Sequence, residues 1–143
     1  MIFEGEYING EKLKGKEKEY DVDGKLIFEG EYLNGNRNGK GKEYDDGKLI
    51  FEGEYLNGKR NGKCKEYDDD KLIFEGEYLN DIRNGKGKEY NNESKLIFEG
   101  EYLNDIRNGK GKEYWFNGNL KFEGEYLNGK RMEKEKNIIG MVN

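Results

Sequence analysis

Hydrophobic and polar positions alternate along most of the chain, and the same alternation returns six times. Residues 48–56 have the sequence KLIFEGEYL, in which Phe51, Gly53 and Tyr55 are separated by single glutamates. Residues 39–44, GKGKEY, alternate glycine with lysine. A period of two is typical of a β-strand, because successive side chains point to opposite faces. Segments rich in Gly, Asn and Asp separate these runs, so each copy is predicted to be a β-hairpin followed by a short turn.

The spacing of the copies indicates a linear array. Near-copies of FEGEY begin at Phe3, Phe28, Phe51, Phe74, Phe98 and Phe122, at intervals of 25, 23, 23, 24 and 24 residues. Units of this length stack so that each contacts only its neighbours. We expect one array over residues 1–137, with units at about 1–24, 25–47, 48–70, 71–94, 95–118 and 119–137, and a short C-terminal tail at 138–143. The predicted fold class is all-β: an elongated, twisted, single-layer antiparallel sheet of about twelve strands.

One hairpin register satisfies both faces of the sheet. It places three pairs on the ring-bearing face: Tyr32 with Gly39, Gly30 with Gly41, and Phe28 with Glu43. It pairs opposite charges on the other face, Glu31 with Lys40 and Glu29 with Lys42, and repeats this as Glu54 with Lys63, Glu77 with Lys86 and Glu101 with Lys110. Each such pair contributes about 0.2–1 kcal/mol. We therefore expect one face of aromatic rings lying over glycines and one face of paired charges.

The turns between units vary in sequence. The sequence YDDGK that begins at Tyr44 suits a three-residue loop with Gly47 in the left-handed conformation. Asp70 takes the equivalent place in YDDDK, and Asp tolerates that conformation.

Composition narrows the function classes. Charged residues make up 40% of the chain, and the net charge is −5, whereas a chain that coats nucleic acid is usually basic, so no nucleic-acid partner is expected. A single cysteine excludes an intrachain disulfide framework and favours a reducing compartment, so the expected location is cytoplasmic. No apolar run approaches transmembrane length.

Catalytic and metal chemistry lack the usual side chains. The chain has no His, one cysteine (Cys64) and one serine (Ser94), so no common nucleophile–base pair can be assembled. It also lacks a His/Cys ligand cluster. We expect no enzyme activity, no cofactor and no metal site. Cys64 stands at a strand-glycine position and is interpreted as a small residue tolerated there.

The repeated phrase resembles the MORN repeat: an aromatic residue, E-G-E, a second aromatic residue, an N-G-K turn and a G-x-G strand. It occurs as FEGEYLNGKRNGKCKEY from Phe51 and FEGEYLNDIRNGKGKEY from Phe74. Two features depart from the family pattern. Tyrosine replaces the family's usual tryptophan at positions 32, 55, 78, 102 and 126, and strand glycines are replaced at Glu17, Cys64, Glu133 and Glu135. The resemblance implies an open antiparallel sheet without catalysis, acting as a scaffold or peptide-binding module, in some members as a dimer, with phosphoinositide binding also proposed.

The first candidate site is the row of rings. Its members are Phe28, Tyr32, Phe51, Tyr55, Phe74, Tyr78, Phe98, Tyr102, Phe122 and Tyr126. A one-layer sheet is expected to leave part of this row exposed as an apolar stripe, and such stripes often mark interaction sites. We expect this aromatic groove to bind a peptide, a helix or a second copy of the chain. The alternative is that the rings form only the core of the sheet and that the chain is a spacer without a ligand.

The second candidate site is a basic edge formed by the hairpin loops. Its members are Arg37, Lys59, Arg60, Arg83, Arg107, Lys130 and Arg131. Aspartates gather at the opposite edge, in the connecting turns. The basic edge is the alternative site, for an acidic partner or for phosphoinositides at a membrane, and it would place the protein at the periphery of a membrane or the cytoskeleton.

Overall fold

A computed structural model describes residues 2–8 and 10–132. All regular structure in these residues is β, and the strands alternate between the two halves of the repeat. Their bounds are β1 Ile2–Ile8, β2 Glu11–Tyr20, β3 Leu26–Leu33, β4 Asn36–Asp45, β5 Lys48–Leu56, β6 Lys59–Asp68, β7 Lys71–Leu79, β8 Ile82–Tyr90, β9 Leu96–Leu103, β10 Ile106–Tyr114, β11 Leu120–Leu127 and β12 Lys130–Met132.

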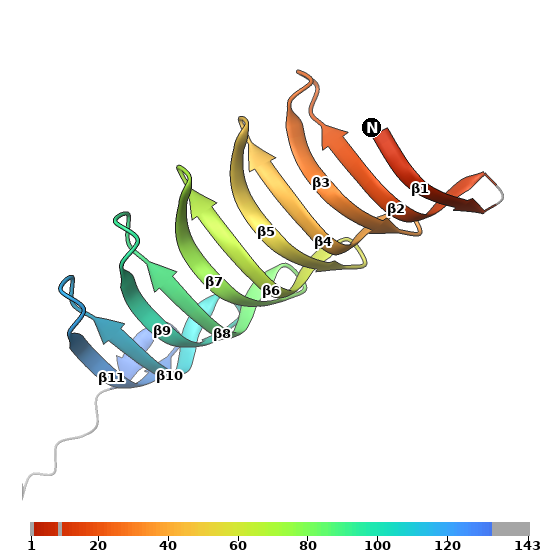
Figure 1. Ribbon diagram of the computed structural model, residues 1–143. Helices are drawn as coiled ribbons and strands as arrows, with labels where there is room; N and C mark the ends of the chain where they lie inside the picture. Colours follow the sequence, from red (N-terminus) through yellow and green to blue (C-terminus); the bar gives the residue numbers. More distant parts are fainter. Residues whose placement is uncertain (1, 9, 133–143) are drawn as a thin grey trace, which may run out of the picture.

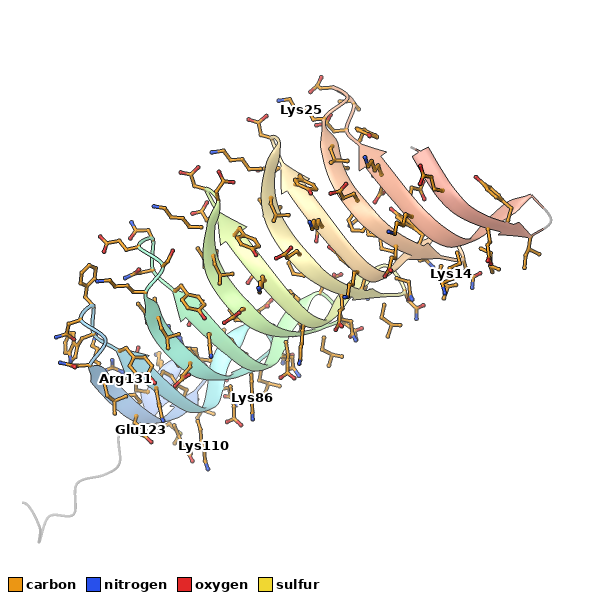
Figure 2. All side chains as sticks on the ribbon, viewed as in Figure 1. Lys14, Lys25, Lys86, Lys110, Glu123 and Arg131 are labelled. Atoms are coloured by element: carbon orange, nitrogen blue, oxygen red, sulfur yellow. The ribbon has the colours of Figure 1, made fainter. Side chains whose placement is uncertain are left out.

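The twelve strands form one open antiparallel sheet in chain order, β1 to β12. Each strand is curved along its length, and the strands lie side by side in chain order, so that the sheet forms a long trough (Figure 1). The predicted fold class is therefore confirmed. The connecting turns lie along one long edge and the hairpin loops along the other, so that Lys25 and Lys14 are at opposite edges in Figure 2.

Two-residue turns close most of the hairpins. Asn34 and Gly35 both have positive φ (51° and 80°), which is the type I′ geometry that matches strand twist. The left-handed conformations predicted for Gly47 (φ 80°) and Asp70 (φ 67°) are present. The predicted three-residue loop is wrong, however. Asp46 is also left-handed (φ 49°), and β5 begins at Lys48, so only two residues separate β4 from β5.

The predicted register holds for half of each hairpin and fails in the other half. Gly30 lies opposite Gly41 and Phe28 opposite Glu43, as expected. Tyr32, however, faces Arg37, because β4 bulges around Gly39, which has a φ of 98°. The pairing predicted within a unit occurs instead between units: Gly39 faces Tyr55, and Lys40 faces Glu54.

The core is a single row of rings on one face of the sheet. Phe and Tyr of one strand lean toward each other over the glycine between them, and each Phe also meets the Tyr of the next unit. Phe28 packs edge-to-face on Tyr32 and on Tyr55, with centroids 5.7 and 5.3 Å away. These T-shaped contacts are favourable because the positive ring edge meets the negative ring face. The row therefore connects the units from Phe28 to Tyr126 into one continuous core.

Candidate functional site

The ring row is almost completely buried, so the expected exposed stripe is wrong. Phe28, Phe74 and Phe98 have no exposed surface, and Tyr32 is 5% exposed. The structure brings all ten predicted rings into one row, and Phe122 alone is only partly buried. Whether this row contacts a partner stays a prediction. Its burial makes the other face of the sheet the better candidate.

Arginines cover the rings, and this corrects the picture of a free basic edge. The guanidinium carbons of Arg37, Arg60, Arg83 and Arg107 each lie 4.0 Å from the centroid of a Phe ring, and Arg131 lies 4.7 Å from Phe122. Such cation–π contacts are strongest where water is excluded. Of the seven residues assigned to that edge, Lys59 and Lys130 alone remain exposed without an ion pair to a described residue.

Each of these arginines also pairs with a glutamate of the preceding unit. Arg60 Nε donates to Glu43 Oε2 at 2.7 Å, and the Tyr55 hydroxyl donates to the same oxygen. Burial raises the pKa of the Glu43 carboxyl, but the hydrogen bonds from Arg60 and Tyr55 outweigh burial, so this pKa is lowered. The carboxylate is therefore held charged, and it joins two consecutive units.

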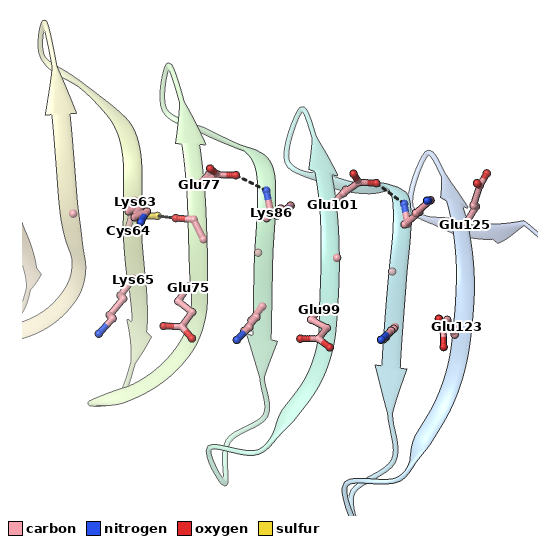
Figure 3. A pocket seen from close by; sticks show the side chains of 18 of the residues that line it. Lys63, Cys64, Lys65, Glu75, Glu77, Lys86, Glu99, Glu101, Glu123 and Glu125 are labelled. Atoms are coloured by element: carbon pink, nitrogen blue, oxygen red, sulfur yellow. Dashed lines mark hydrogen bonds between the residues drawn. The ribbon is translucent and has the colours of Figure 1, made fainter.

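The opposite face carries a groove with a volume of about 2450 Å³ that extends from β4 to β12. Two rows of charged side chains form its walls (Figure 3). The loop-side row comprises Lys40, Glu54, Lys63, Glu77, Lys86, Glu101, Lys110 and Glu125. The turn-side row comprises Glu52, Lys65, Glu75, Lys88, Glu99, Lys112 and Glu123.

The floor of the groove is bare backbone. It consists of Gly53, Cys64, Gly76, Gly87, Gly100, Gly111 and Gly124, which lie between the two charged rows. These positions point away from the groove: a Cβ added at Gly87 would lie 2.7 Å from the Phe74 ring on the opposite face. A glycine at position 87 therefore leaves room for the ring core, and the open floor is the consequence on the other face.

Hydrogen bonds hold most of the groove glutamates in place. In the loop-side row, Glu77 Oε2 accepts the backbone N–H of Lys86 at 2.6 Å, and Glu101 accepts that of Lys110 at 2.6 Å. In the turn-side row, Glu52 Oε1 accepts the Tyr67 hydroxyl at 2.6 Å. Burial, and then the bond to Glu52, raises the pKa of Tyr67 to about 12.

The lysines of the groove, unlike most of its glutamates, make no side-chain contact of this kind in the described part of the chain. Within residues 2–8 and 10–132, none of their ammonium groups makes an ion pair or a hydrogen bond. The predicted register between the lysine and the glutamate of one hairpin is present in the turn-side row, where Lys65 lies opposite Glu52, but it is wrong in the loop-side row, where Lys63 lies opposite Glu77 of the next unit. In neither row do the described side chains of such a pair form an ion pair. Glu54, for example, accepts the backbone N–H of Lys63 at 3.0 Å rather than its ammonium.

Cys64 fits the small-residue interpretation. It is 6% exposed, and its Sγ–H donates to the carbonyl of Gly76 at 3.4 Å. Burial raises the pKa of the thiol to about 12, far from the range of a reactive thiolate. Glu133 and Glu135, which replace strand glycines in the repeat pattern, lie outside the described residues.

Sequence reasoning assigned the charged face to hairpin stability and missed the groove. The signal was present in the sequence, because every Glu-x-Glu strand is followed by a Lys-x-Lys strand. Only the pairing between units shows that these charges form two continuous rows.

The fold and the groove define an open β-repeat array rather than an enclosed active site. The MORN repeat model matches residues 28–48, 51–72, 74–94, 98–120 and 122–134, and a MORN repeat variant matches residues 13–34. The chain therefore belongs to the MORN repeat family, as the sequence pattern predicted. A comparison with curated proteins gave no match.

MORN repeats are non-enzymatic modules that commonly bind proteins or membranes. No helix of the described part of the chain is long and apolar enough to cross a membrane. The described residues also contain no cluster of three or more His, Cys, Asp or Glu side chains arranged to hold a metal ion.

Proposed function

We propose that this chain is a non-catalytic interaction scaffold that binds a segment of a partner protein in the charged groove. One observation carries the proposal: the groove is long and open, and its lysine ammonium groups have no partner within the described residues. A single ion pair at the surface contributes little binding free energy. A row of charges that is complementary to the charges of a partner speeds association and determines which partner binds.

The groove replaces the aromatic row as the proposed contact surface. The rings are covered by arginines that already pair with glutamates, for example Arg83 with Glu66 at 2.6 Å. A partner on that face would have to break these pairs. A partner in the groove meets charged side chains and open backbone without displacing any contact of the described core.

Selection from a random peptide library tests the proposal. Peptides selected on the purified protein should lose at least tenfold in affinity for a Lys63→Glu/Lys65→Glu variant, because this change reverses a positive band of the groove. A Lys59→Glu/Lys130→Glu variant carries the same change in net charge outside the groove and should bind normally.

The same selected peptides can also give the result that would contradict the proposal. Peptides that bind both variants equally well, but change in affinity when Arg60→Leu removes the guanidinium that covers the Phe51 ring, would place binding on the aromatic face and overturn the proposal.

A further inference from the structure

On any one strand, the side chains that belong to the two rows carry charges of the same sign. Glu75 and Glu77 contribute two negative charges from β7, whereas Lys86 and Lys88 contribute two positive charges from β8. The groove is therefore crossed by bands of alternating charge, one band for each strand (Figure 3). Since neighbouring strands lie about 4.8 Å apart, bands of the same sign recur at about 9.6 Å.

The bands do not cancel one another by pairing within the described chain. One oxygen of Glu77 is held by a backbone N–H, and three glutamates of the turn-side row, Glu52, Glu75 and Glu99, are held by tyrosine hydroxyls, as Glu75 is by Tyr90 at 2.5 Å. The carboxylates are thus held in position, while the lysine side chains remain able to turn toward a ligand. A ligand that carries both signs in the correct order can therefore contact every band.

Among regular peptide conformations, polyproline II best matches this spacing. It has three residues per turn and rises about 3.1 Å per residue, so every third side chain returns to the same side after about 9.3 Å. A β-strand returns to the same side after about 6.8 Å, and a helical heptad extends about 10.5 Å. Over four repeats the polyproline II helix drifts by about 1.2 Å from the bands, whereas the heptad drifts by about 3.6 Å, close to the next band of the wrong sign.

We propose that the groove selects a peptide in polyproline II conformation whose acidic and basic side chains each recur at every third residue. This inference rests on the proposed function and names the kind of segment that the groove accepts. Acidic side chains of the ligand lie against the lysine bands, such as Lys63 and Lys86, and basic side chains lie against the glutamate bands, such as Glu77.

Two peptides of equal composition test the inference. The first contains four copies of Glu-Pro-Lys, with a fluorescein label. The second contains two copies of Glu-Glu-Pro-Lys-Lys-Pro, in which a lysine falls about 9.3 Å after the first glutamate and therefore onto a lysine band. Fluorescence anisotropy at low ionic strength should show at least tenfold tighter binding of the first peptide, and added salt should weaken that binding.

A charge-reversal variant locates the binding. Lys86→Glu/Lys88→Glu changes one positive band into a negative one and should weaken binding of the first peptide at least tenfold. The matched Lys59→Glu/Lys130→Glu variant should stay within twofold of the unchanged protein. Circular dichroism verifies that both variants are folded.

Equal affinity for the two peptides, or no binding of either, would overturn the proposed spacing. The scaffold function fails separately. It would stand if library-selected peptides of another pattern still lost affinity for the Lys63→Glu/Lys65→Glu variant, and it would fall if they did not.

Discussion

At the scale of single residues, the arginine after each hairpin loop determines what the ring face can do. The sequence predicted Arg37 in a loop, at an exposed edge. The two-residue turn instead lets β4 begin at Asn36, so Arg37 is a strand residue that points to the ring face, opposite Tyr32. A turn two residues long rather than four is not evident from the letters NGNRN, because both lengths accept Asn and Gly.

Replacement of one arginine should therefore cost stability. Arg83 stacks on Phe74 and pairs with Glu66. Arg83→Leu removes both contacts and leaves a half-buried carboxylate with fewer partners, so we expect a loss of about 2 kcal/mol in the free energy of unfolding. Urea denaturation measures this, with the exposed Lys59→Leu as the control. Equal midpoints for the two variants would show that the arginine contacts contribute nothing.

Two other glutamates that pair with arginines, Glu43 and Glu113, make stability depend on pH. The pKa values of Glu43 and Glu113 are lowered in the folded protein, because hydrogen bonds from arginine, joined at Glu43 by the bond from Tyr55, outweigh burial. A lowered folded pKa gives stability that is present above the ordinary pKa of glutamate, about 4.3, and is lost as the pH falls through the folded value.

Urea denaturation should accordingly give a lower midpoint at about pH 3.5 than at pH 7. Glu43→Gln should lose stability at pH 7 and show a smaller change between the two pH values. An unchanged pH dependence in this variant would show that Glu43 does not contribute to the loss of stability in acid.

At the scale of strands, the period-two pattern was enough to predict which side chains share a face. It was not enough to predict the full register. Gly39 forms the bulge because it can adopt a φ of 98° with the Glu31 carboxylate close by, and a sequence that already alternates Gly with Lys does not mark one glycine as different. The groove was missed for the same reason, since its rows arise from pairing between units.

The strand glycines fall into two classes. A Cβ at Gly100 would lie 2.6 Å from the backbone oxygen of Lys110, whereas a Cβ at Gly87 would meet the Phe74 ring tip at 2.7 Å. Backbone cannot move away cheaply, but a ring tip can, and Cys64 already occupies a position of the second class.

We therefore expect Gly100→Ala to lower the free energy of unfolding by about 3 kcal/mol and Gly87→Ala by about 1 kcal/mol. Thermal melts followed by circular dichroism compare the two. The reverse order would contradict the assignment of the two classes.

At the scale of the whole molecule, each strand pairs only with its neighbours in the chain. The free energy of unfolding of such an array is approximately the sum of the stability of each unit and of the interfaces between neighbouring units. Deletion of residues 71–94 joins Asp70 to Lys95, a junction of the same residue types as Asp70 and Lys71.

The shortened chain should therefore fold into a five-unit sheet with a lower melting temperature and a single cooperative transition. Its circular dichroism spectrum should remain that of a β-protein. A disordered spectrum would show that the array depends on contacts beyond nearest neighbours.

We propose that a partner segment lies in the charged groove and not on the ring face. Lysine acetylation footprinting with mass spectrometry tests it directly, with and without a library-selected peptide at saturation. We expect the peptide to protect Lys63, Lys65, Lys86 and Lys88 from acetylation and to leave Lys59 and Lys130 unchanged. Protection confined to Lys59 and Lys130, with the groove lysines as reactive as in the free protein, would contradict it.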